Sequence, residues 1–159
     1  MKKLGYFESN HEFPEEIITA AGMVPVKMCG DPEFSTDRAD EYLPPFICGA
    51  ARSILHQAIE TCNNFDGFAI VHGCDATNRQ YDLWEEHVPS SVIYYLHHPL
   101  KSDNIAKKYL IKELRVFKEF IEEKFHVSIT DDNLIAAIEL SNKIKQTRSE
   151  ERRVGKECA

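Results

Sequence analysis

Two apolar runs separated by a single helical segment constrain the fold of this chain more than any other feature. Residues 65–72 (FDGFAIVH) form a nearly continuous apolar run, which is typical of a strand buried on both faces of a sheet. Residues 91–96 (SVIYYL) are expected to form another buried strand. One helix, beginning at Cys74–Asp75, joins the two runs, so the strands should lie parallel, connected by a right-handed crossover.

Helix-boundary and turn signals predict the remaining elements. Pro14 with its neighbouring glutamates favours a helix start, Gly22 favours a helix stop, and Pro25 suits a strand at a sheet edge. The expected elements are a helix over 14–21, a strand over 23–28, a loop over 31–45, a helix over 49–61, a long helix capped at 102–103, and a last helix capped at 130–132. The predicted fold class is α/β: a doubly wound, mostly parallel Rossmann-like sheet with helices on both faces, followed by C-terminal helices.

Composition and charge exclude several classes of protein. The formal net charge is -7, and no stripe of Lys and Arg with interleaved aromatics overrides it, so nucleic-acid binding is not expected. The apolar stretches are too short for a membrane span, and the start of the chain lacks the apolar core of a secretory signal. Five widely spaced cysteines without such a signal indicate a reduced, cytoplasmic chain. Neither GxGxxG nor GxxxxGK[ST] occurs, so the chain itself is not expected to bind ATP.

Two cysteines stand where predicted helices begin. Cys48 directly precedes the 49–61 helix, and Cys74 lies between the buried strand and the helix that follows it. A helix N-terminus favours a thiolate, and thiolates are the ligands of iron–sulfur clusters and soft metals. Two thiolates from separate loops at one sheet edge make a plausible shared site, since parallel sheets bind ligands at the C-terminal ends of their strands. There are two alternatives for Cys48 and Cys74: they are ordinary thiols, or they form a zinc site that a histidine completes. For Cys29 and Cys62 we prefer the interpretation as ordinary thiols.

Other polar residues follow the same strand ends. His72 is two residues before Cys74, and His97 and His98 follow the 91–96 strand. These histidines, with Asp75 and Arg79, could line the site. For His72 the competing interpretation is a core histidine whose hydrogen bonds are satisfied.

Several segments together resemble the 2-hydroxyacyl-CoA dehydratase / benzoyl-CoA reductase family. The resemblance covers about residues 5–146, in order and with plausible spacing. The segments that carry it are GYF at 5–7, PEEII at 14–18, AAGMVPV at 20–26, ADEYLP at 39–44 with Cys48 and RS at 52–53, DG at 66–67, GCD at 73–75, Arg79, YD at 81–82, Trp84, and AIELSN at 137–142.

The resemblance implies an iron–sulfur subunit with two Rossmann-like domains. Such a subunit holds a 4Fe-4S cluster by three cysteines, of which Cys48 and Cys74 match the first two and the third lies outside this chain. It pairs with a homologous sister subunit and receives one electron from an ATP-hydrolysing iron–sulfur activator. The implied activity is that of a lyase, in which an acyl-CoA substrate, an (R)-2-hydroxyacyl-CoA, loses water through a ketyl radical to give a 2-enoyl-CoA.

The sequence departs from the family pattern after Cys48, after Asp75 and between Phe7 and Pro14, which leaves the subfamily open. The alternatives are a benzoyl-CoA reductase-type subunit, a double-cubane-cluster reductase subunit, and a non-catalytic partner that relays electrons. The last residues, from Arg148, resemble translated sequencing adapter, so we expect a fragment that is inactive alone. We expect a Rossmann-like cluster-binding domain over 1–100, a helical segment over 101–147 leading to a missing second domain, and a non-native tail over 148–159, disordered or loosely helical.

Overall fold

The computed structural model describes residues 1–8, 13–30 and 35–157 and shows an α/β fold. Its described strands form one parallel four-stranded sheet with the order β2-β1-β3-β4. The strands are β1 (Lys3–Phe7), β2 (Val24–Lys27), β3 (Gly67–Val71) and β4 (Ile93–Leu96). The predicted fold class, a doubly wound parallel sheet, is therefore confirmed.

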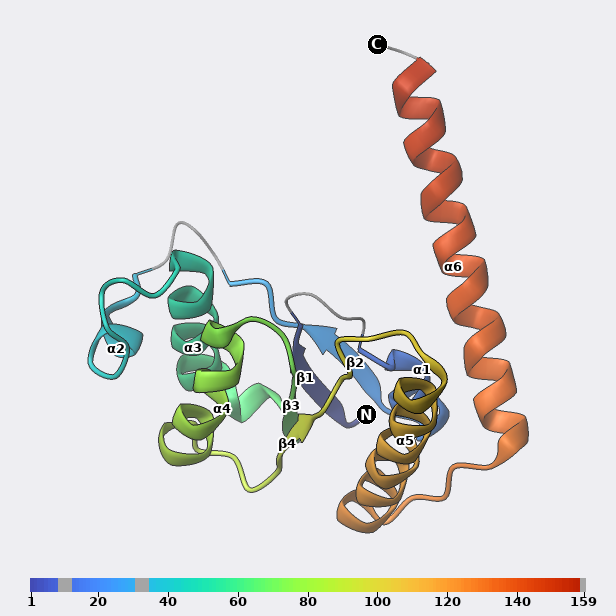
Figure 1. Cartoon of the computed structure of the whole chain (residues 1–159), viewed down its shortest axis with the longest axis horizontal. Helices are drawn as coiled ribbons and strands as arrows, with labels where there is room; N and C mark the ends of the chain where they lie inside the picture. The colour runs from blue at the N-terminus through green and yellow to red at the C-terminus, as the bar shows by residue number, and fades with distance from the viewer. Residues whose placement is uncertain (9–12, 31–34, 158–159) are drawn as a thin grey trace.

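Helices cover both faces of the sheet (Figure 1). On one face lie α3 (Gly49–Thr61) and α4 (Asp75–His87), with the short α2 (Asp37–Asp40) beside α3. On the other face lie α1 (Glu15–Ala20) and α5 (Asn104–Phe125), and α6 (Asp131–Glu157) packs against α1 and projects beyond the body. None of the described helices combines the length and apolar character that a membrane span requires.

Each face of the sheet has its own apolar core. Leu4, Tyr6, Val71 and Leu96 face α1 and α5, where Phe117 of α5 is fully buried. The opposite core contains Phe7, Phe68 and Ile70 of the strands, Met28 directly after β2, Ile54 and Leu55 of α3, and Trp84 of α4. Alternate residues of β1, β3 and β4 thus point to opposite cores, as the pleat requires.

Two strands differ from the expectations. All five residues of β3 are buried, as predicted, but β4 is an edge strand whose first three residues are only half-buried. The prediction of full burial for 91–96 was wrong because an apolar sequence does not tell which side of a strand lacks a neighbour. β1 was not predicted at all, although it lies between β2 and β3 at the centre of the sheet.

The predicted helix ends are confirmed by their hydrogen bonds. Gly22, with a φ of 71°, ends α1, and the Met23 N–H donates to the carbonyl of Ile18. The Asp103 carboxylate accepts from the Ala106 N–H at 2.8 Å, which caps α5. Thr130 Oγ1 accepts from the Asn133 N–H at 3.2 Å at the start of α6.

The predicted loop contains a short helix that was not expected, whereas the tail is helical, which is one of its two expected states. α2 lies within the 31–45 loop, whose residues 31–34 are outside the described part of the chain. α6 continues to Glu157, so the segment from residue 148 is helical as far as it is described. Cys158 lies outside the described residues, and the non-native origin of the tail stays a prediction.

Candidate functional site

The two cysteines predicted to bind a cluster occupy equivalent places in the fold. Cys48 is the N-cap residue of α3 and Cys74 is the N-cap residue of α4, and both are exposed. Residues 62–66 join the end of α3 to the start of β3. α4 begins shortly after the end of β3. Both helix N-termini therefore lie at the C-terminal edge of the sheet, which is where parallel sheets present their ligand-binding loops.

A buried amide joins these two helices near their N-terminal ends. Gln80 of α4 donates from Nε2 to the carbonyl of Ala51 in α3, and its Oε1 accepts from Trp84 Nε1 at 3.2 Å. α3 and α4 are in direct contact, and the axes of packed helices lie about 8–10 Å apart.

The loop that carries Cys74 is held by one side-chain oxygen. Asn78 Oδ1 accepts from the Gly73 N–H at 3.3 Å and from the Tyr95 hydroxyl at 2.6 Å. Burial, and then the charge of Asp82, raises the pKa of Tyr95 above its ordinary value, so the phenol keeps the proton that it donates. The backbone before Cys74 is thus tied through α4 to the edge strand β4.

The predicted histidines differ in what surrounds them. His72 and His97 both meet the ring of Tyr95 edge-on, with centroid separations of 6.3 and 4.8 Å. His72 Nδ1 is buried without a hydrogen-bond partner, so the interpretation of His72 as a satisfied core histidine is not supported. His98 Nδ1 lies 2.9 Å from the carbonyl oxygen of the neighbouring Pro99.

An open pocket of about 510 Å³ adjoins this cluster, beside the edge strand β4. Asn78, Tyr81, Tyr95 and His97 line it, together with Phe120 of α5. Asp75 and Arg79, the other residues predicted to line a site, are exposed on α4. The structure brings together His72, His97, Asn78 and the Cys74 loop, all around Tyr95.

The metal-binding potential of the described residues is limited to pairs. Among residues 1–8, 13–30 and 35–157, no group of three or more His, Cys, Asp or Glu side chains is arranged to hold a metal ion. The alternative zinc site, built from Cys48, Cys74 and a histidine, is therefore not formed within this part of the chain.

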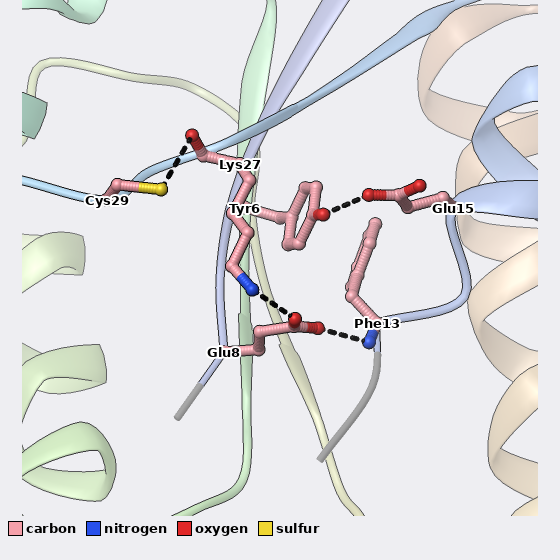
Figure 2. A network of polar contacts seen from close by, with 6 residues as sticks. All are labelled: Tyr6, Glu8, Phe13, Glu15, Lys27 and Cys29. Atoms are coloured by element: carbon pink, nitrogen blue, oxygen red, sulfur yellow. Dashed lines mark hydrogen bonds and ion pairs between the residues drawn. The ribbon is translucent and has the colours of Figure 1, made fainter. Parts of the chain in front are cut away.

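Polar contacts join the described residues at the other half of the same sheet edge (Figure 2). The Glu8 carboxylate accepts from Lys27 Nζ at 2.6 Å and from the Phe13 N–H at 2.5 Å. The Tyr6 hydroxyl donates to Glu15, and burial together with this hydrogen bond raises the pKa of Tyr6. Cys29 is exposed here, its thiol 3.9 Å from the Lys27 carbonyl, whereas Cys62 is buried on α3's side of the core, as predicted.

Three residues of the site were not predicted from the sequence: Asn78, Gln80 and Tyr95. Their partners lie 4 to 29 residues away along the chain, and most of these contacts follow no local pattern. Of the three, only Gln80 could have been noticed in the sequence. It precedes Trp84 by four residues, so it is a polar residue on the apolar face of α4.

The fold and the site define a class: an open α/β protein with exposed thiols at two neighbouring helix N-termini. The model of the family 2-hydroxyglutaryl-CoA dehydratase, D-component, matches residues 11–157. The chain belongs to this family.

Curated relatives agree with the family match. The chain is 29% identical over 132 residues to a subunit of benzoyl-CoA reductase from Thauera aromatica, covering 81% of this chain and 34% of that protein. It is 29% identical over 140 residues to (R)-2-hydroxyglutaryl-CoA dehydratase subunit beta of Acidaminococcus fermentans, covering 86% and 37%. It is 26% identical over 131 residues to lactoyl-CoA dehydratase subunit beta of Anaerotignum propionicum, covering 81% and 34%. The chain thus spans about a third of the length of these relatives.

Proposed function

We propose that this chain forms the cluster-bearing part of an iron–sulfur subunit of a 2-hydroxyacyl-CoA dehydratase, with Cys48 and Cys74 as cluster ligands. One observation carries the proposal: two exposed thiols begin two neighbouring helices that a buried amide ties together. Two of the relatives are named as subunits of enzymes that dehydrate 2-hydroxyacyl-CoA compounds.

The donor set fits an iron–sulfur cluster in kind. Clusters are held by cysteine thiolates, and N–H groups at a helix N-terminus stabilise negative charge on sulfur. The described residues offer two such thiols, so further ligands have to come from polypeptide beyond them, in line with the greater length of the relatives.

The proposed reaction is the loss of water from an (R)-2-hydroxyacyl-CoA to give a 2-enoyl-CoA, within a complex with a sister subunit and an ATP-hydrolysing activator. A bound cluster supplies one-electron transfer and a Lewis-acidic iron. This chain's residues contribute positions: Cys48 and Cys74 hold the group, while Asn78 and Tyr95 fix the backbone that precedes Cys74.

A reductase-type subunit is the second candidate. The chain is as similar to the benzoyl-CoA reductase relative as to the 2-hydroxyglutaryl-CoA dehydratase relative, at 29% identity in both comparisons. Assays with the activator and sister subunit separate the two, because a dehydratase releases water from a 2-hydroxyacyl thioester and a reductase adds electrons to an aromatic one.

The ligand assignment is tested by anaerobic titration with ferric iron, sulfide and excess dithiothreitol, which reduces part of the iron as the cluster assembles. We expect a sulfur-to-iron charge-transfer band, read without desalting because two thiolates retain metal weakly. Cys48→Ser and Cys74→Ser should each abolish most of the band.

Cys29→Ser is the matched control, since Cys29 is also an exposed thiol at the same sheet edge but not at a helix N-terminus. It should leave the band intact. A band that survives both the Cys48 and Cys74 replacements, or that Cys29→Ser removes as effectively, would disprove the assignment.

A further inference from the structure

Gln80 is a polar side chain in a place where an apolar one is expected. It is fully buried, and only one other polar residue of the described chain, Ser53, is buried with it. It lies on the face of α4 that carries Trp84, which packs edge-on against Phe68 in the α3/α4 core. Burying an amide in such a core is unfavourable unless its hydrogen bonds are made.

Both ends of the Gln80 amide are used, in two different directions. Nε2 reaches across to the Ala51 carbonyl of α3, and Oε1 accepts from Trp84 Nε1 within α4. The indole holds the amide in one orientation, and the amide then reaches one carbonyl of the neighbouring helix. A methionine of similar shape could fill the volume but could make neither bond.

The position of this link relates it to the two cysteines. Ala51 is three residues after Cys48, and Gln80 is six residues after Cys74, so the link lies about 5 Å below one helix start and about 9 Å below the other at a 1.5 Å rise per residue. Many of the described side chains between α3 and α4 are apolar, and apolar contacts are not directional. The amide is therefore a directional contact that ties a given position of α4 to a given position of α3.

We propose that Gln80 is a positioning residue that sets the relative position of Cys48 and Cys74, so that both thiols reach one bound group. This inference rests on the proposed function for its purpose, whereas the geometric effect is measurable without any metal. Gln80 touches no ligand itself and acts through the placement of α3 against α4.

The first arm of the test measures distance. Spin labels are attached to Cys48 and Cys74 in the full chain with Cys29, Cys62 and Cys158 replaced by alanine, and the label-to-label distance distribution is recorded. Gln80→Met should shift or broaden the distribution while circular dichroism stays unchanged. Gln146→Met, at an exposed position of α6, is the matched control and should leave the distribution as it is.

The second arm uses Cd²⁺ alone as a probe for paired thiolates, followed by its thiolate charge-transfer absorption. Residues that orient metal ligands typically contribute tenfold to a hundredfold in affinity, so Gln80→Met should weaken Cd²⁺ binding roughly tenfold. An unchanged distance distribution in folded Gln80→Met overturns the inference, whatever the metal result. A changed distribution with no Cd²⁺ or iron binding by the parent supports the positioning effect and refutes the proposed cluster.

A second variant covers failure to fold. Gln80→Met leaves the Trp84 indole N–H without a partner inside the core, which is the main risk to folding. Should Gln80→Met lose its native circular dichroism, the double variant Gln80→Met/Trp84→Phe is measured in both arms, because it leaves no orphaned indole donor. The same distance criterion then decides for or against the inference.

Discussion

Replacement of Asn78 by alanine should loosen the backbone that precedes Cys74, with an effect that is largest at one amide. Asn78 Oδ1 is the acceptor for the Gly73 N–H, at 3.3 Å, and the Tyr95 hydroxyl bonds the same oxygen at 2.6 Å. A single hydrogen bond of this kind contributes about 1 kcal/mol net. Because about 1.4 kcal/mol corresponds to a tenfold change in an equilibrium constant, the Gly73 amide should exchange about fivefold faster in Asn78→Ala.

Hydrogen exchange followed by NMR reads this amide directly. Asn78→Asp keeps an acceptor oxygen in place, so it should retain most of the protection that Asn78→Ala loses. Tyr95→Phe should give an intermediate effect, because the phenyl ring remains and only the hydroxyl that orients Asn78 is lost.

Tyr94→Phe is the matched control on the same strand. Tyr94 packs against Phe117 and Phe120 on the α5 face, away from the Cys74 loop, so its change should leave Gly73 exchange unaltered. The proposed role of Asn78 would be refuted if Gly73 exchanged at an unchanged rate in Asn78→Ala. It would also be refuted if Asn78→Asp and Asn78→Ala lost the same protection of the Gly73 amide.

Two further predictions concern stability. Phe117→Ala should lower the free energy of unfolding, measured in urea, by about 3–5 kcal/mol, because Phe117 is fully buried against Phe13 and Tyr94. Phe46 is exposed, so Phe46→Ala should change this free energy by less than about 0.5 kcal/mol. Similar losses in both variants would contradict the assignment of Phe117 to the core. Burial raises the pKa of Glu16, but hydrogen bonds from Ser141 and the backbone and the charge of Lys145 outweigh it and lower the pKa below 4.5. A carboxyl group whose pKa is lower in the folded than in the unfolded chain stabilises the fold at pH values above its unfolded-state pKa. This stabilisation is lost as the pH falls through the folded-state pKa. Glu16→Gln should therefore destabilise the chain by about 1 kcal/mol at neutral pH and much less in acid, and an equal loss at both pH values would contradict this.

Local sequence signals predicted every described α-helix except the short α2, because helix ends are chemically local. Gly22 needs its positive φ, and Asp103 caps the N–H of a residue only three positions away. β1 escaped prediction because five residues carry too little periodicity, and its central position comes from pairing with β2 and β3. The half-exposed edge of β4 could not be predicted, since Tyr94 and Tyr95 are as apolar in sequence as residues of a buried strand.

Some residues of the candidate site could be predicted from the sequence and others could not. Cys48 and Cys74 could be found because each directly precedes a predictable helix start. Gln80 and Tyr95 could not be assigned roles, since their functions depend on Ala51 and Asn78, which are distant in the sequence and adjacent only in the fold.

Polar groups along the C-terminal edge of the sheet differ in whether they have hydrogen-bond partners. At β1 and β2, the Glu8 carboxylate bonds a lysine and a backbone N–H, so this carboxylate has its hydrogen-bond partners within the described residues. At β3 and β4, His72 Nδ1 is buried without a hydrogen-bond partner and His97 is exposed beside an open pocket. Because buried polar atoms in folded proteins normally have partners, the unsatisfied nitrogen favours the β3/β4 half, where Cys74 begins α4, as the half that receives a ligand.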